Sequence, residues 1–219
     1  MAADVDASRV TVLVFTRTPI AGRVKTRLVP ALGAHGAVRL HRTMLRRTVA
    51  CAVEAGIGRV ELWCAPSIEH PWLAEIAATF GVALERQTDG DLGMRMHHAL
   101  RSACADGRGA LLVGSDCPGL QSEDLRQAAD ALGEGADAVL GPALDGGYYL
   151  VGVRRSDSSL FSGVEWGSAG VLDATRERLR ALGWRWRELG VRRDVDRPED
   201  LDAVQALLDA APGAKAPIF

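Results

Sequence analysis

The stretch that decides the fold is VTVLVFTRTPIAGRVKTRL, residues 10–28, in which a hydrophobic run passes directly into a basic loop. The run from Val10 to Phe15 is dominated by β-branched and aromatic side chains, which is typical of a strand buried on both faces. Strands of that kind belong to sheets that helices cover on both sides. The stretch therefore predicts an α/β protein with this strand inside its sheet.

Segments with strand and helix patterns alternate along the rest of the chain. Strands are predicted at 59–64, 82–86, 109–113, 136–141, 148–153 and 184–189 (the last one at an edge), and helices at 36–55, 71–80, 92–105, 122–132, 169–182 and 198–210. Ser122 is the expected N-cap of its helix, and the two glycines after Asp145 can turn the chain back antiparallel. This order predicts a mixed, mostly parallel sheet flanked by helices. We expect one domain over residues 1–211 and a frayed tail over 212–219.

Composition and charge exclude several functional classes. The 219 residues are 47% hydrophobic and carry a net charge of −2, so no overall basic field would hold a nucleic acid. No hydrophobic run approaches the roughly 20 residues that span a bilayer, and the first residues lack a secretory pattern. The four cysteines are scattered without a CxxC pair, which favours buried thiols in a reducing compartment. We expect a cytoplasmic protein that binds neither nucleic acid nor membrane.

The basic loop after the first strand is a candidate phosphate site. It carries Arg17, Arg23, Lys25 and Arg27, and Gly22 shapes its turn. In α/β sheets ligands bind beyond the carboxyl ends of the strands, where cations and free backbone N–H groups suit a phosphate chain. The loop matches neither the P-loop nor the GxGxxG pattern. A solvated basic loop is the alternative.

Acidic residues follow other strands at the same predicted edge. Asp116 lies in GSDCPGL after the strand 109–113, Asp145 lies in DGGYYLVG, and Asp194 and Asp196 lie in RDVDRPEDL. Carboxylates beside a phosphate site are the ligands that Mg²⁺ or Mn²⁺ prefers, so Asp116 and Asp196 are candidate metal ligands and Asp194 is able to join them. Asp145 is a candidate general base. The alternatives are turn or capping roles for Asp116 and Asp145, and support of the helix start for Asp196.

Two further loops can contact a substrate. Gln87 and Arg95 lie in QTDGDLGMRM, whose amide, acids and glycines suit a nucleoside, although alone it is an ordinary loop. Trp166, in GVEWGS, and Tyr148 are candidates for contact with a sugar or an acceptor. A position in the core is the alternative for the tryptophan.

Six motifs together resemble one bacterial family. They are FTRTPIAGRVKTRL, DLGMRM, GSDCPGL, DGGYYLVG, GVEWGS and RDVDRPEDL, which run in this order from Phe15 to Leu201. They resemble the transferases of radical-SAM and selenodomain gene neighbourhoods, within the nucleotide-diphospho-sugar transferase (GT-A) superfamily. The KTRL and DRPEDL pieces are similar to those of 2-phospholactate guanylyltransferases. Arg197 stands where many relatives have Thr, and SDC at 115–117 stands in place of an Asp-x-Asp motif.

The resemblance implies a Rossmann-like GT-A domain that binds a nucleotide through the first loop and a divalent cation, Mg²⁺ or Mn²⁺, through Asp116. It favours a glycosyltransferase that moves a sugar from a nucleotide-diphosphate sugar to a small-molecule acceptor, with Asp145 as the base. The alternative is a nucleotidyltransferase that joins a nucleoside triphosphate to a phosphorylated metabolite, with Lys25 and its neighbouring arginines carrying the catalysis. The density of cations in the first loop favours the triphosphate, and the family favours the sugar. A nucleotide-binding module without turnover is the third reading.

Overall fold

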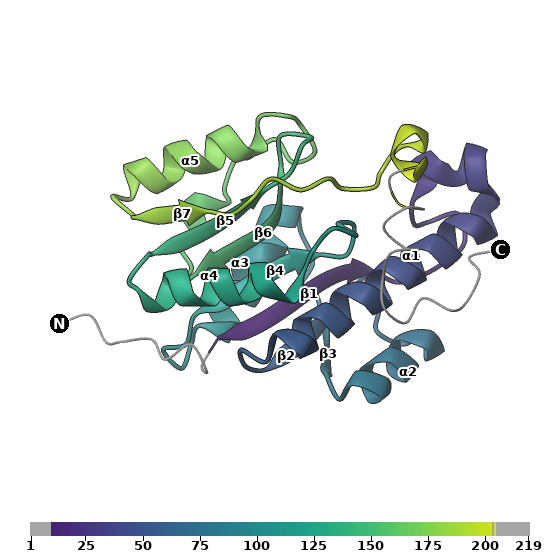
Figure 1. Cartoon of the computed structure of the whole chain (residues 1–219), viewed down its shortest axis with the longest axis horizontal. Coiled ribbons are helices and arrows are strands. Elements are labelled where there is room, and N and C mark those ends of the chain that lie inside the picture. Colours follow the sequence, from purple (N-terminus) through teal and green to yellow (C-terminus); the bar gives the residue numbers. More distant parts are fainter. Residues whose placement is uncertain (1–9, 203, 205–219) are drawn as a thin grey trace.

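The computed structural model describes residues 10–202 and 204. The chain folds into a seven-stranded sheet with helices on both faces (Figure 1). The strands are β1 (Thr11–Arg17), β2 (Val60–Ala65), β3 (Ala83–Arg86), β4 (Ala110–Gly114), β5 (Ala138–Pro142), β6 (Tyr148–Val153) and β7 (Trp186–Glu188). Their order across the sheet is β3-β2-β1-β4-β6-β5-β7. Strand β6 runs antiparallel to both of its neighbours, and the other pairs are parallel. The predicted α/β class and the mixed, mostly parallel sheet are confirmed.

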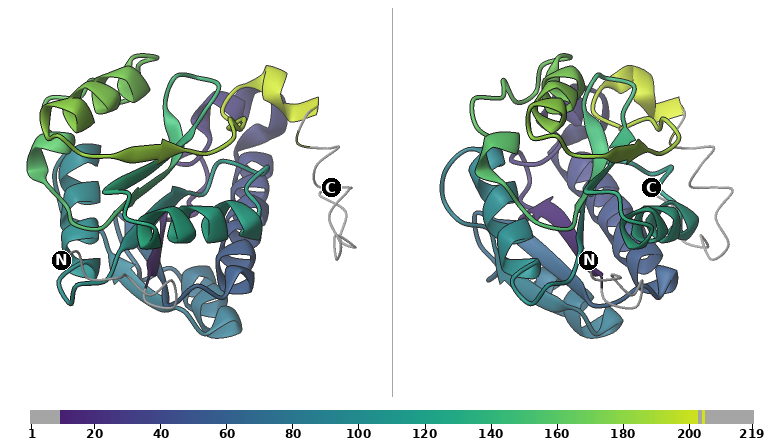
Figure 2. Two further views of the ribbon diagram at one scale, coloured as in Figure 1. Left: turned by 60° about the vertical axis from the view of Figure 1, so that its left-hand side comes forward. Right: turned by 90° about the vertical axis from the view of Figure 1, so that its left-hand side faces the viewer.

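The helices form two layers, one on each face of the sheet. They are α1 (Val29–Ala55), α2 (Pro71–Phe80), α3 (Leu92–Ala103), α4 (Ser122–Gly133) and α5 (Val171–Ala181), with 3-10 turns η2 (Thr26–Leu28), η3 (Ser158–Leu160) and η4 (Pro198–Asp200). Figure 2 shows α1 and α4 on one side of the sheet and α3 and α5 on the other. No helix in the described part of the chain is both long enough and apolar enough to cross a bilayer.

Strand β1 contributes to the hydrophobic core on each face. Val12 and Val14 pack with the residues of α1, α2 and α4, and Leu13 and Phe15 pack with those of α3 and α5. Successive strand residues point to opposite faces, so a strand buried on both sides has to be apolar at almost every position. This explains the continuous hydrophobic run. The four cysteines are free thiols, and burial raises the pKa of each of them to about 12.

Helix α1 begins at Val29, seven residues before the predicted start at Gly36. The additional residues are separated from the predicted helix by a break at Gly33, which has φ 67° and ψ 165°. The turn before the break still forms because Leu28 and Leu32 pack against Met44 and Val195. The sequence gives no sign of this contact, which joins the start of α1 to the C-terminal part of the chain.

Other predicted boundaries also need correction. Gln121, not Ser122, is the N-cap of α4, and its backbone N–H donates to the Asp124 carboxylate at 2.8 Å. Strand β7 is shorter than the predicted 184–189, because Trp184 is buried in the core before the strand begins, but it lies at the predicted edge. The predicted helix 198–210 starts as η4 and is helical at 201, 202 and 204. Its remainder and the tail 212–219 lie outside the described residues.

The predicted glycine turn after Asp145 brings β6 back against β5. Asp145 Oδ1 accepts a hydrogen bond from the Gly147 N–H at 2.9 Å. Gly146 has a left-handed backbone, with φ 88°, and its carbonyl accepts from the Leu172 N–H at 2.9 Å. A Cβ atom at Gly146 would lie 2.1 Å from the Ala169 carbonyl oxygen. The turn therefore fits against the start of α5 only because this position is glycine.

We expect Gly146→Ala to lower the free energy of unfolding by about 2 kcal/mol or more, because the substitution adds left-handed strain to a clash with a backbone oxygen. Chemical denaturation measures the change. Gly190→Ala is the control, since a Cβ there meets nothing within 4 Å, and we expect it to cost less than about 0.5 kcal/mol. Equal stability of the two variants would contradict this account.

Candidate functional site

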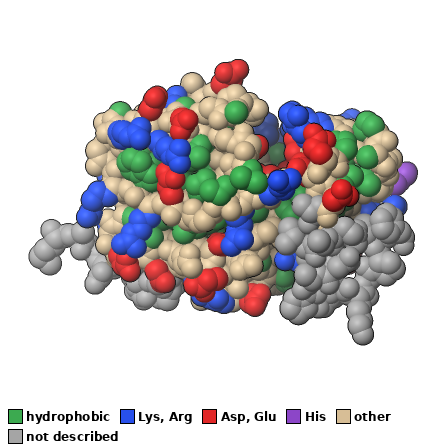
Figure 3. Space-filling view, turned by 45° about the horizontal axis from the view of Figure 1, so that its top comes forward, with side chains coloured by type: hydrophobic (Ala, Val, Ile, Leu, Met, Phe, Trp, Pro, Cys, Tyr) green, Lys and Arg blue, Asp and Glu red, His purple; other side chains and the backbone are tan. Residues whose placement is uncertain are grey.

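The carboxyl ends of β1 and β4 and the segment after β7 meet at one edge of the sheet. The Val195 N–H donates to the Asp116 carbonyl at 2.9 Å, which joins the segment after β7 to the loop after β4. A cleft of about 640 Å³ opens here, called the basic cleft below. Figure 3 shows a hollow in the surface with basic and acidic side chains around it. The sequence-predicted residues that line the basic cleft are Arg17, Arg23, Lys25, Arg27, Gln87, Arg95, Asp116 and Asp196.

Lys25 joins the three segments of this edge. Its Nζ atom forms an ion pair with Asp116 Oδ2 at 2.9 Å and donates to the Val195 carbonyl. The Lys25 side chain is 3% exposed, whereas that of Asp116 is 48% exposed. Among the described residues, Lys25 is the one non-glycine residue with a positive φ, at 48°. Such a backbone costs energy and is typical of functional sites, and here the two partners of the ammonium group hold it in place.

Asp116 is linked through a chain of polar contacts to three buried side chains. Ser115 Oγ lies 3.4 Å from Asp116 Oδ1, and Thr16 Oγ1 lies 3.3 Å from Ser115 Oγ. His41 Nε2 then lies 3.3 Å from Thr16 Oγ1 and 3.0 Å from the Arg17 carbonyl. Burial is the main cause of the lowered pKa of His41, which keeps its ring neutral at neutral pH. The sequence did not point to His41, because its partners are 24 and 25 residues away.

The other predicted residues of the basic cleft differ in how strongly contacts within the protein hold their side chains. Arg27 forms an ion pair with Asp196, and both side chains are well exposed, so the pair adds little stability and a ligand can compete for it. Arg95 Nε donates to the Gly90 carbonyl at 2.9 Å. Gln87 is buried, and its Nε2 donates to the Trp63 carbonyl at 2.8 Å. Gly22 shapes the loop with φ 75°.

A second chamber of about 200 Å³ adjoins the basic cleft, and both are lined by Phe15, Leu92 and Gly114. Tyr148 and Trp166 form part of its wall, with their rings edge to face at 6.5 Å between centroids. Trp166 packs against the start of α3, where a Cβ at Gly93 would lie 2.9 Å from Trp166 Nε1. Asp145 and Asp194 also line the second chamber.

Asp194 is the site residue whose importance the sequence understated. Burial, together with the nearby carboxylates of Asp116 and Asp145, raises its pKa to about 7, and Lys25 opposes the shift. Asp194 Oδ1 is buried and has no hydrogen-bond partner in the described part of the chain. Three acidic groups therefore influence one another where the basic cleft meets the second chamber.

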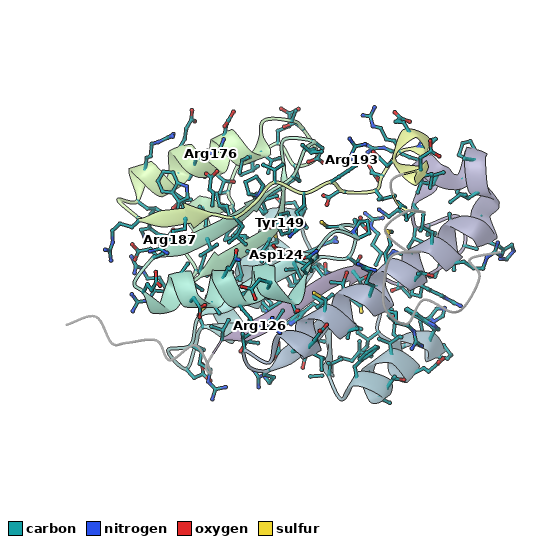
Figure 4. The ribbon with its side chains drawn as sticks, viewed as in Figure 1. Asp124, Arg126, Tyr149, Arg176, Arg187 and Arg193 are labelled. Carbon is teal, nitrogen blue, oxygen red and sulfur yellow. The ribbon has the colours of Figure 1, made fainter. Side chains whose placement is uncertain are left out.

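Two contacts fix the segment that carries Asp194. The Arg192 guanidinium donates to Asp124 Oδ1 at 2.7 Å at the start of α4. The Tyr149 hydroxyl, on β6, donates to the Gly190 carbonyl at 3.1 Å. Figure 4 labels Asp124 and Tyr149, which lie beside each other beneath this segment. The buried carboxylate thus lies on a segment that side chains of α4 and β6 hold against the sheet.

The residues present fit a divalent cation that a ligand helps to hold. No three His, Cys, Asp or Glu side chains of the described residues are close enough to hold a metal by themselves. Mg²⁺ at phosphate sites is commonly held by one or two carboxylates together with the phosphates. The half-exposed Asp116 and the partnerless Oδ1 of Asp194 match that arrangement. The predicted ligand Asp196 lies in the same cleft but is paired with Arg27.

A comparison of sequences shows the family of the chain. The model of the family described as "Uncharacterized protein conserved in bacteria (DUF2064)" matches residues 48–168, which is more than half of the chain, and the chain belongs to this family. It matches no curated protein sequence.

Solved structures share the fold over nearly the whole chain. A protein of Desulfovibrio desulfuricans G20, provisionally described as a nucleotide-diphospho-sugar transferase, is 29% identical, with a TM-score of 0.85 over 96% of this chain and 92% of that one. A cytidylyltransferase of Leptospira borgpetersenii is 15% identical, with a TM-score of 0.60 over 96% and 90% of the two chains. Glucosyl-3-phosphoglycerate synthase of Mycobacterium tuberculosis, solved with Mn²⁺ and UDP, is 13% identical, with a TM-score of 0.54 over 95% and 82%. The expected Rossmann-like GT-A fold is confirmed, and it is shared by glycosyl- and nucleotidyltransferases.

We expect Lys25→Met to lower the free energy of unfolding by about 2 kcal/mol, because Asp116 and the Val195 carbonyl both lose a charged donor. Asp116→Asn added to Lys25→Met should recover part of this loss, since it removes the charge left without a partner. Denaturant titrations of the two single variants and the double variant measure the coupling. Arg23→Met, in the same loop, is the control. Strict additivity of the two substitutions would show that the ion pair contributes nothing.

Asp194→Asn should stabilise the protein more as the pH rises. The pKa of Asp194 is raised to about 7 in the folded state, above the value near 4 of an unfolded chain. The stability that the wild type has at low pH is therefore lost as the pH rises from about 4 through 7, whereas asparagine stays neutral. We expect the melting temperature of the variant, relative to the wild type, to be higher at about pH 8 than at about pH 5. Asp89→Asn, at a side chain that is 95% exposed, is the control. A difference that does not change with pH would contradict the assignment.

Proposed function

We propose that this member of the DUF2064 family is a metal-dependent glycosyltransferase, which moves a sugar from a nucleotide-diphosphate sugar to a hydroxyl group of a small acceptor. The observation that carries the proposal is the pair of carboxylates, Asp145 and Asp194, in the chamber next to the basic cleft. An acceptor hydroxyl must lose a proton to become a nucleophile, and a carboxylate can take it. An acceptor phosphate is already ionised, so it needs no base and would be repelled.

The basic cleft supplies the charge that a leaving diphosphate needs. Arg17 at the end of β1, Arg23 in the loop after it and Arg95 on α3 line the cleft. A guanidinium group can donate two parallel hydrogen bonds to the oxygens of one phosphate. The amino end of α3, capped by Asp91, also lines the cleft, and helix amino ends favour anions. Lys25 contributes indirectly, because it holds Asp116 and Val195 in place. These groups are fixed before the substrate arrives, so they stabilise developing negative charge with little rearrangement.

The chemical step joins the acceptor oxygen to the anomeric carbon of the sugar as the bond from that carbon to the diphosphate oxygen breaks. Asp145 takes the proton of the acceptor hydroxyl through Oδ2, because its Oδ1 accepts from the Gly147 N–H. Mg²⁺ or Mn²⁺, when held by Asp116, Asp194 and the phosphates, supplies further positive charge for the departing nucleoside diphosphate. Trp166 and Tyr148 bound the space in which sugar and acceptor meet.

Nucleotidyl transfer is the second candidate, favoured by the number of cations in the basic cleft. Arg17, Arg23, Arg27, Lys25 and Arg95 line it, a set that suits a triphosphate. In that reaction an acceptor phosphate attacks the α-phosphorus, pyrophosphate leaves, and positioning and charge neutralisation provide most of the catalysis. The fold admits both reactions, so the substrate has to be identified by experiment.

A thermal-shift panel of nucleoside diphosphates, triphosphates and nucleotide sugars, each with and without Mn²⁺, separates these functions. With Mn²⁺ present, we expect one nucleotide sugar to raise the melting temperature of the protein more than its parent diphosphate does. Without Mn²⁺ we expect no such difference between the two ligands. A ligand at a hundred times its Kd stabilises the folded state by about 2.7 kcal/mol, a shift of several degrees. A triphosphate that gives the largest shift would favour nucleotidyl transfer, and binding without any product in a subsequent assay would favour a binding module.

Two matched variants locate the cation. Asp116→Asn should abolish the extra shift that Mn²⁺ produces while the protein stays folded, because the side chain lies at the surface of the cleft. Asp106→Asn should leave that extra shift intact. Asp106 is similarly exposed and also pairs with an arginine, but it precedes β4 and so lies at the opposite edge of the sheet. A full Mn²⁺ effect in Asp116→Asn would overturn the role given to Asp116.

A further inference from the structure

The basic cleft and the second chamber differ sharply in charge although they adjoin. The basic cleft is lined by four arginines and Lys25, which outnumber its three aspartates, Asp91, Asp116 and Asp196. The lining of the second chamber holds no lysine, arginine or histidine among the described residues, and its two charged groups are both acidic. The Arg178 guanidinium acts on Tyr148 from nearby, but it is tied to the Ser162 and Ala174 carbonyls and is not part of the lining. An anion that enters the second chamber therefore meets the Asp145 carboxylate, with no cationic side chain of the lining to balance it.

The wall of the second chamber is mostly apolar and partly aromatic. Met96 and Leu112 are buried hydrophobic side chains of this wall, and Trp166 and Tyr148 add flat surfaces. Burial also raises the pKa of the Tyr148 phenol, so the ring stays uncharged. Apolar walls with a few polar groups at one end are typical of sites for small uncharged molecules. Asp145 and Asp194 are the charged groups of this lining, and Ser168 adds a hydroxyl.

We propose that the second chamber binds an acceptor that carries no phosphate or carboxylate and that presents an apolar or flat face to Trp166, with its hydroxyl directed to Asp145. This inference rests on the proposed function and specifies the acceptor class. Asp145, which is not among the residues that would hold the cation, repels anions, in the way that an unbalanced like charge rejects a wrong ligand. The aromatic wall contributes contact with a ring or with the C–H face of a sugar. Phosphorylated metabolites belong, by the same argument, to the basic cleft.

Binding to the second chamber can be followed through the Trp166 indole N–H signal in a two-dimensional NMR spectrum. Trp166→Phe identifies the signal, and the indole of Trp72, which packs on the other face of the sheet, is the internal reference. The probes are two matched pairs, 2-phenylethanol with 2-phenylethyl phosphate and glucose with glucose 6-phosphate. We expect at least one neutral probe to shift the Trp166 signal with a Kd at least about tenfold lower than that of its phosphate, a difference of about 1.4 kcal/mol. Phosphates that bind only in the basic cleft should leave this signal unmoved.

A pair of arginine substitutions on α3 tests the charge argument directly. Leu92 lines the second chamber and is 43% exposed, and Met94, on the same helix and 59% exposed, is not part of its lining. Leu92→Arg should reduce or reverse the preference for the neutral probe, because it supplies the missing cation. Met94→Arg should leave the preference as in the wild type. Equal changes in the two variants would overturn the inference.

Two other results would also overturn it. One is a phosphate that shifts the wild-type Trp166 signal at the same or a lower concentration than its neutral partner. The other is that neither neutral probe shifts it at millimolar concentration. These failures differ from failure of the proposed function, which is measured by product formation. Sugar transfer to a phosphorylated acceptor would uphold the glycosyltransferase and refute the acceptor class. Selective binding of the neutral probe without any sugar transfer would uphold the ligand class of the second chamber and refute the glycosyltransferase.

Discussion

The contacts of the Lys25 ammonium group hold the site together. This buried nitrogen bonds the Asp116 carboxylate and the Val195 carbonyl. It therefore joins three segments, since Asp116 follows Lys25 by about ninety residues and Val195 follows Asp116 by about eighty. A buried charge is costly unless its partners compensate it, and a left-handed backbone adds to the cost. The basic cleft therefore has its shape only when the segment after β7 is in place. Figure 1 shows this segment crossing to the start of α1.

The same segment carries Asp194, and its anchoring explains how an unfavourable carboxylate persists. Arg192 is bonded to Asp124 just before Asp194, and Val195 is bonded to Asp116 just after it. The backbone between them cannot move the side chain out to water without breaking one of these contacts. The raised pKa of Asp194 is thus a cost imposed by the surrounding packing. A divalent cation or a proton would relieve it, which is why the site is suited to bind one.

The sequence predicts the fold well because its signals are local. The hydrophobic run of β1 must be buried on both faces, and the loops after successive strands must meet at one edge, so Asp116 and the first basic loop were found together. The features that were missed depend on distant partners. Gly33 interrupts helix α1, and the helical turn before it forms because Leu28 and Leu32 pack with Val195. Asp194 and Asp196 are equivalent in the sequence motif DVD. They differ in the structure because Arg27 pairs with Asp196, whereas Asp194 is buried.

The reversed strand β6 explains why a basic cleft and an acidic chamber can share one edge. In a fully parallel sheet only the carboxyl ends of strands reach the ligand edge. Because β6 is antiparallel to β4 and β5, its beginning lies at that edge, and so do the turn at Asp145 and the ring of Tyr148. The sheet thus delivers cations from the loop after β1 and a carboxylate with an aromatic wall from the loop before β6. One fold can therefore separate the group that leaves as an anion from the group that must arrive without charge.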